Sequence, residues 1–174
     1  MQRRDNTARM AKALWSPESN ELSASEFQAQ FDAIYSAAEG LATLWQLGGA
    51  ANDYLRLHPD SIVVPEELAP KLVASSMVDA RIIGLKLLVR CSWDIRLIGS
   101  SICKALESKH EHELYGGLCE LHNSLRRFDS VASMPVDDLL AGLGRLSSSR
   151  DAYERQSAAR LADWIEELRG AKLR

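Results

Sequence analysis

The sequence predicts an all-α protein of about eight helices. Apolar residues recur at steps of three and four over most of the chain, which is the spacing of one helical face. Aromatic residues make up only 6% of the sequence, and runs of valine, isoleucine and threonine, which favour strands, are few. Hydrophobic residues at 46% and charged residues at 26% are typical of a soluble globular protein.

The length of the chain favours one domain after an N-terminal arm. A chain of 174 residues has the usual size of a single domain, and it can bury roughly two-thirds of its unfolded surface without a disulfide or a metal. Residues 1–20 are polar and charged with little periodicity, so we predict a flexible arm there, with at most a short helix over residues 9–15. The single α-helical domain is predicted over residues 21–174.

A capping-box pattern opens the first long helix, because Ser23 is followed three residues later by Glu26. Apolar side chains then follow on one helical face: Phe27, Phe31, Ile34, Ala38, Leu41 and Trp45. This pattern predicts one helix over residues 24–47. Gly48 and Gly49 are expected to interrupt it, with a short helix continuing beyond them.

Six further helices are predicted from apolar periodicity and from their first residues. Proline suits the first turn of a helix, and an aspartate near a helix start favours the free amides there. The predicted spans are residues 65–76, 79–91, 94–108, 113–128, 135–146 and 151–169. Residues 61–64 are apolar, but so short a segment without a partner strand makes no sheet, and we interpret it as a linker.

Two nearly identical segments, DARIIG from Asp79 and DIRLIG from Asp94, begin fifteen residues apart. In each copy the aspartate lies near a helix start, and the arginine and the glycine stand three residues apart on one flank. A glycine on a helix flank lets a neighbouring backbone approach closely. Gly84 and Gly99 are therefore expected at close contacts between helices, where a larger side chain destabilises the fold.

A third, weaker copy of this spacing lies near the C-terminus. It consists of Arg155, Ala158 and Leu161, which follow the same steps as Arg81, Gly84 and Leu87. The order of arginine, small residue and leucine resembles the inner helix of HEAT-like repeats. The two arginines lie 74 residues apart, close to two repeats of about forty residues, although the midpoint near Leu118 has no matching arginine. The resemblance implies an irregular HEAT-like stack over residues 65–169. A plain helical bundle is the alternative.

Acidic residues concentrate in residues 13–70, which hold nine carboxylates and one basic residue, Arg56, for a net charge of −8. The whole chain carries only −3. Five polar residues share the flank of the predicted first helix opposite its apolar face: Asp32, Ser36, Glu39, Thr43 and Gln46. A field of one sign speeds encounter with an oppositely charged partner. We therefore predict partner binding by four acidic residues, Glu26, Asp32, Glu39 and Asp53. A solvated helix face is the alternative.

One cluster has the residue types of a zinc site, since His110, His112, Cys119 and His122 follow closely in sequence. A polar loop explains the first two histidines without a metal, and we predict neither a bound metal nor a cofactor. The sequence has no Gly-x-Ser-x-Gly nucleophile motif and no phosphate-binding loop. No catalytic residue is assigned.

Basic residues do not form a stripe typical of nucleic-acid binding. Arg126 and Arg127 are adjacent, and a series of four arginines follows: Arg145, Arg150, Arg155 and Arg160. Steps of five spread such a series around a helix instead of along one face, so nucleic acid is not the predicted partner.

The cysteines and the N-terminus indicate the compartment. Cys91, Cys103 and Cys119 are odd in number and lie in apolar periodic segments, which is typical of free thiols in a reducing cytosol. The sequence shows no secretory leader and no uninterrupted apolar run long enough to cross a membrane. We expect a cytoplasmic protein without a membrane partner.

Together these observations predict a protein-interaction module with an acidic docking face. In general character the chain is similar to bacterial immunity proteins and inhibitors, which are small, acidic and helical and which occlude a toxin or nuclease. The expected partner is then another protein of basic character. A HEAT-like nucleic-acid-binding protein or enzyme, with the HEAT-like DNA glycosylases as the enzyme class, is the alternative.

Overall fold

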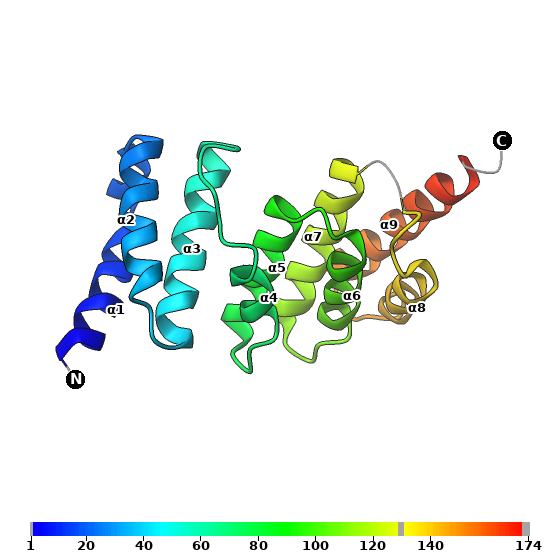
Figure 1. Ribbon diagram of the computed structural model, residues 1–174. Helices are drawn as coiled ribbons and strands as arrows, with labels where there is room; N and C mark the ends of the chain where they lie inside the picture. The colour runs from blue at the N-terminus through cyan, green and yellow to red at the C-terminus, as the bar shows by residue number, and fades with distance from the viewer. Residues whose placement is uncertain (1, 129–130, 172–174) are drawn as a thin grey trace. The chain divides into compact units, whose positions relative to one another are not determined.

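The computed structural model describes residues 2–128 and 131–171, and within them it is entirely helical (Figure 1). The all-α prediction is confirmed. The helices are α1 (Gln2–Leu14), the short 3-10 helix η1 (Pro17–Glu21), α2 (Ala24–Ser36), α3 (Leu41–Leu57), α4 (Leu68–Val73), α5 (Val78–Cys91), α6 (Ile95–Leu106), α7 (Glu111–Phe128), α8 (Val136–Leu146) and α9 (Ala152–Ala171). Within this described part of the chain, no helix combines the length and the apolar character needed to span a bilayer.

The chain divides into two compact units, Met1–Leu87 and Leu88–Arg174. Unit 1 contains α1 to α4 and most of α5, and unit 2 contains the end of α5 and α6 to α9. We treat each unit by itself, and the prediction of one domain over residues 21–174 stays a prediction.

Helix α1 occupies most of the segment predicted as a flexible arm over residues 1–20. It packs against α2 and α3 of unit 1, and it buries Ala11 and Leu14, which are 0% and 3% exposed. The structure corrects the prediction in the described part of this segment. The apolar periodicity is weak in sequence because two of the three buried side chains within residues 6–14, Thr7 and Ala11, are small.

The expected helix over residues 24–47 is divided into α2 and α3. Helix α2 begins as predicted, because Ser23 and Glu26 form the capping box. The break lies at Gly40, whose φ of 109° is a backbone conformation that glycine adopts at little cost. The chain therefore reverses eight residues before the glycine pair that was expected to end the helix.

Gly48 and Gly49 lie inside α3, both buried. A Cβ atom at Gly48 would stand 2.6 Å from Leu72 Cδ1, and one at Gly49 would stand 2.4 Å from the indole carbon Cε2 of Trp15. Both distances are shorter than real contacts between carbon atoms. The pair therefore lets α4 and Trp15 pack directly on the backbone of α3, and it does not end the helix.

Unit 2 is built from two helix pairs in two layers (Figure 1). Helix α6 packs on α7 and α8 packs on α9, while α6 also packs on α8 and α7 on α9. This is the neighbour pattern of stacked helix pairs, in which equivalent helices of successive pairs lie side by side. The HEAT-like relationship itself stays a prediction.

Helices α5, α7 and α9 begin at the same kind of turn. In each turn a serine Oγ accepts a hydrogen bond from the backbone N–H two residues later, at 2.9 Å for Ser75, 3.1 Å for Ser108 and 3.1 Å for Ser149. The three serines are separated by 33 and 41 residues. The same hydrogen bond also precedes α6, where the Asp94 backbone N–H donates to Ser92 Oγ at 3.0 Å. The turn therefore marks the starts of four helices and is not restricted to helix-pair spacing.

The arginines of the predicted repeat hold two of these turns. Arg81 Nη1 donates to the carbonyl oxygens of Ser75 and Ser76 at 3.1 and 3.0 Å. Arg155 Nη1 donates in the same way to the carbonyl oxygens five and six residues before it, at 2.9 and 2.6 Å. The turn before α7 has Leu114 at the equivalent position, which explains why the series of arginines fails at its centre.

The close approach expected at Gly84 and Gly99 is confirmed. A Cβ atom at Gly84 would stand 2.6 Å from the backbone nitrogen of Val73, and one at Gly99 would stand 2.5 Å from Pro135 Cδ. Neither obstacle is the flexible end of a side chain, so a neighbouring helix or the chain before it must move to accept a larger residue.

Alanine substitution tests these contacts. We expect Gly84→Ala and Gly99→Ala each to lower the free energy of unfolding by about 1–2 kcal/mol, because overpacking outweighs the better helix propensity of alanine. Gly144→Ala is the matched control, since nothing lies within 4 Å of a Cβ atom there, and it should leave stability unchanged or raise it. Urea unfolding followed by circular dichroism measures all three. A gain in stability at Gly84 or Gly99 equal to that at Gly144 would show that the close contacts are absent.

Candidate functional site

Two of the four acidic residues predicted to bind a partner have roles inside the fold. Glu26 caps α2, where its carboxylate accepts from the backbone N–H of Ser23 at 2.9 Å. Hydrogen bonds from the Ser23 hydroxyl and then from its backbone N–H hold the pKa of Glu26 below its usual range. Asp53 is half-buried and accepts from the indole N–H of Trp15 at 2.7 Å. Asp53 therefore ties the end of α1 to α3.

The other two acidic residues, Asp32 and Glu39, do not share the flank of one helix. Asp32 is exposed on α2, and Glu39 is exposed in the connection between α2 and α3. Thr43, which was expected on the same flank, is buried at 5% exposure. The reversal at Gly40 separates these residues because it rotates and redirects the chain after α2.

A different acidic surface forms where the segment after α3 returns along α2. The Gln28 side chain accepts from the Val63 backbone N–H at 2.7 Å and donates to the Val63 carbonyl at 3.0 Å. Its amide nitrogen also donates to Asp32 at 2.8 Å. One turn of α2 further on, the Tyr35 hydroxyl donates to Glu67 at 2.8 Å. Residues 63–67 are thereby fixed along the exposed side of α2.

We call this surface the acidic face and define it by Asp32, Val63, Glu66 and Glu67. All four residues are exposed, and the Val63 side chain has 77% of its surface in solvent. Hydrogen bonds from its own backbone N–H and then from Tyr35 lower the pKa of Glu67. Burial, followed by the bond to Glu67, raises the pKa of Tyr35 to about 12, so the hydroxyl remains a donor across the physiological range.

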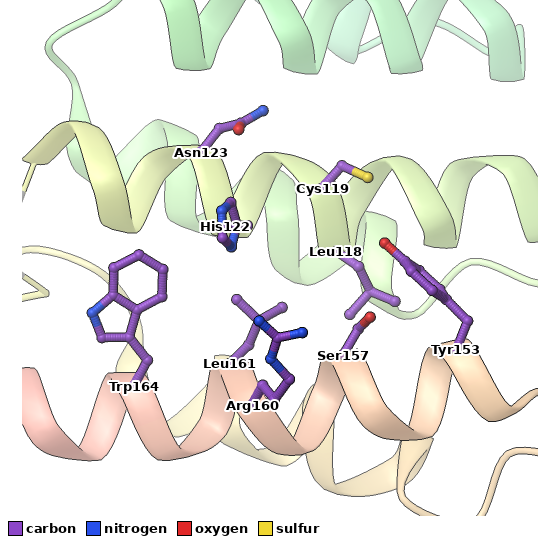
Figure 2. Close-up of a pocket in the computed structure, with 9 residues that line it drawn as sticks. All are labelled: Leu118, Cys119, His122, Asn123, Tyr153, Ser157, Arg160, Leu161 and Trp164. Atoms are coloured by element: carbon purple, nitrogen blue, oxygen red, sulfur yellow. The ribbon is translucent and has the colours of Figure 1, made fainter.

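A groove in unit 2 lies between α7 and α9 (Figure 2). Its volume is about 510 Å³. Nine residues line it, four from α7 and five from α9: Leu118, Cys119, His122, Asn123, Tyr153, Ser157, Arg160, Leu161 and Trp164. The contact between α7 and α9 in the second layer of the stack positions all of them.

Aromatic rings stand at the two ends of the groove (Figure 2). At one end the Trp164 indole meets the His122 ring edge to face, with 5.4 Å between centroids. At the other end Tyr153 lies 5.1 Å from Tyr115, centroid to centroid. Hydrogen bonding to Tyr153, followed by the influence of Cys119, raises the pKa of Tyr115 to about 12. Tyr115 therefore keeps its hydroxyl proton near pH 7.

The structure separates the residues of the candidate zinc cluster. Cys119 and His122 line the groove, whereas His110 and His112 are exposed around the start of α7. Residues 2–128 and 131–171 contain no group of three histidine, cysteine or carboxylate side chains arranged to hold a metal ion. The grouping in sequence did not become a grouping in space because a helix turns its successive side chains to different sides.

Trp93 forms a second feature of unit 2 that the sequence analysis did not single out. It precedes α6 and has 77% of its surface exposed. The Arg127 guanidinium carbon lies 4.6 Å from the Trp93 ring centroid and 4.9 Å from that of Phe128. Arg127 also donates to the carbonyl of Val89, so the exposed ring and the guanidinium are held in a fixed stack.

Comparisons with family models, with curated proteins and with solved structures return no match for this chain. The acidic face, the groove and the Trp93 stack are therefore the observations on which a function is proposed.

The packing role of Asp53 and the surface role of Asp32 can be distinguished by the free energy of unfolding of their alanine variants. Asp53→Ala should lower the free energy of unfolding by about 1–3 kcal/mol, because it leaves the half-buried Trp15 indole N–H without its charged acceptor. Asp32→Ala is the control and should change stability by less than about 0.5 kcal/mol, since Asp32 is exposed. Thermal and urea unfolding provide the measurement. Equal effects of the two substitutions would contradict the division between packing and surface roles.

Proposed function

We propose that this protein is a protein-interaction module that binds a basic partner through the acidic face. The observation that carries the proposal is the pair of hydrogen bonds between Gln28 and the backbone of Val63, in which the Val63 N–H donates to the Gln28 amide oxygen and the Gln28 amide nitrogen donates to the Val63 carbonyl. It holds an apolar side chain in solvent, next to Asp32 and Glu67, on an ordered segment. An exposed apolar residue beside acidic side chains suits a small interface with a desolvated centre and a polar rim.

The charge of this part of the chain supports a basic partner. Residues 13–70 carry nine carboxylates and one arginine, and eight of the nine acidic residues are exposed. Such a field raises the rate of encounter with a positively charged surface and disfavours acidic partners. The order of the segment lowers the entropy lost on binding, because Val63 is already held in place.

An inhibitor or immunity-type role fits these properties best. A small helical protein of this kind acts by occluding a basic surface, such as the substrate-binding surface of a toxin or nuclease, and it needs no catalytic group of its own. We propose a cytoplasmic location for this activity, on the basis of the free cysteines.

Charge reversal tests the proposal. Asp32→Lys with Glu66→Lys should slow association with the partner by about tenfold or more, because the attractive field becomes locally repulsive. The difference from the wild-type rate should be largest at low salt, where the charges are least screened. Glu166→Lys with Glu167→Lys is the matched control, since both residues are exposed acids on α9 in unit 2. A pull-down with the wild-type protein supplies the partner, and surface plasmon resonance at low and high salt gives the rates.

The fold should survive both double substitutions, and circular dichroism with thermal unfolding verifies this. If the reversal on the acidic face and the control reversal give the same association rate as the wild type, the acidic face is ordinary solvated surface.

Nucleic-acid binding is a second candidate function, and the Trp93 stack favours it. An exposed tryptophan with a guanidinium against its ring resembles the stacking platforms that hold unpaired bases, where each stacked base contributes about 1–3 kcal/mol. The residues around Trp93 in sequence include exposed Arg90 and Arg96, which can contact phosphates.

A labelled oligothymidylate tests this second function by fluorescence anisotropy at low salt. If it is correct, Trp93→Ala should weaken binding by about fivefold to a hundredfold, the loss of one stacked base. Tyr115→Ala, which removes an exposed aromatic side chain elsewhere in unit 2, should leave affinity unchanged. No binding by the wild type, or equal loss in both variants, would exclude the Trp93 stack as a nucleic-acid site.

A further inference from the structure

The groove between α7 and α9 has the size and the form of a small-molecule site. Its volume of about 510 Å³ lies within the range of about 300–1,000 Å³ that is usual for ligand pockets. Its lining comes from two helices that pack on each other within unit 2, so the walls belong to the helical frame and not to loops. A site on such a frame keeps its shape when no ligand is present.

The base of the groove is apolar. Leu118 and Leu161 face each other from α7 and α9, and they are 1% and 4% exposed. The rings of Trp164 and Tyr153 bound the space above them at opposite ends (Figure 2). Flat aromatic surfaces at both ends favour a planar apolar body that can pack against a ring face or edge.

The polar part of the lining is positive and rich in donors. Arg160 carries the formal charge among the nine lining residues, and the nine include no carboxylate. In Figure 2 the Arg160 and Ser157 side chains rise from α9 toward α7, between Trp164 and Tyr153. Ser157 and Tyr153 add hydroxyl donors to the guanidinium. Such a set is complementary to an anion, and a guanidinium binds a carboxylate through two parallel hydrogen bonds.

The Arg160 guanidinium is available to a ligand. Other arginines of the same series are engaged within the protein, since Arg155 bonds two carbonyl oxygens and Arg145 pairs with Glu107 at 3.1 Å. Among the described residues, Arg160 has no hydrogen-bond or ion-pair partner. Binding an anion there therefore breaks no existing pair within that part of the chain.

We propose that this groove binds a small organic anion with a planar apolar body, of the aromatic carboxylate class. The ring of the ligand packs over Leu118 and Leu161 between Trp164 and Tyr153, and its carboxylate pairs with Arg160 and accepts from Ser157. This site is independent of the acidic face, because all of its residues belong to unit 2 and none of them belongs to that face.

A pair of isosteric probes tests the proposal by isothermal titration calorimetry. We expect 2-naphthoate to bind the wild-type protein at least about tenfold more tightly than neutral 2-naphthamide, because only the former pairs with the guanidinium. Arg160→Gln should abolish this preference while leaving the affinity for the amide unchanged. Arg150→Gln is the matched control, because Arg150 is an exposed arginine outside the groove, and it should keep the preference.

The apolar half of the site is tested by Trp164→Ala, which should weaken both probes, whereas Trp93→Ala should weaken neither. Circular dichroism and thermal unfolding verify that each variant is folded. Equal affinity of the wild type for the two probes, no detectable binding of 2-naphthoate, or the same loss in Arg150→Gln as in Arg160→Gln would each overturn the proposal. A charge reversal at Asp32 and Glu66 should leave naphthoate binding unchanged, so failure of either proposed site is distinguishable from failure of the other.

Discussion

Close approach of helices at glycine is the constraint on which the packing of both units depends. In unit 1, Gly48 admits Leu72 and Gly84 admits the backbone of Val73. In unit 2, a Cβ atom at Gly99 would meet Pro135 at 2.5 Å, and one at Gly117 would meet Ala105 Cβ at 3.0 Å. These glycines lie within helices, so the helices stay continuous while neighbouring chain packs on their backbones. The close layers that result bury the leucines of the core and leave polar flanks for binding.

Both proposed binding surfaces join residues that are distant in sequence. The acidic face requires α2 and residues 63–67 to lie together, and two side chains of α2, Gln28 and Tyr35, hold that segment through hydrogen bonds. The groove requires α7 and α9 to be neighbours, which the two-layer stacking of helix pairs brings about. In each case the packing of two chain segments forms the surface, and polar or charged side chains beside that contact remain accessible to a ligand.

Arginine has two different tasks in this fold. Arg81 and Arg155 hold the turns that precede α5 and α9, because a guanidinium can donate to two carbonyl oxygens at once. Arg160, one and a half turns beyond Arg155, faces the groove instead. A basic series that looked like solvated surface thus divides into a residue that fixes a helix junction and a residue that gives the groove its charge.

The sequence by itself determined the helical class, the capping box at Ser23, the approximate spans of α5 to α9 and the close contacts at Gly84 and Gly99, because these depend on spacing within one helix. It also indicated Asp32 as a partner-binding residue, and it singled out Cys119 and His122, although as candidates for a zinc site and not for the groove that they line. Only the tertiary structure decided that Gly48 and Gly49 are packing sites, that Asp53 belongs to the Trp15 contact, and that Arg160 and Trp164 face His122 across a groove. The reason is physical: a glycine that permits a reversal and a glycine that admits a neighbouring helix are the same residue in sequence, and they differ only in what lies across from them.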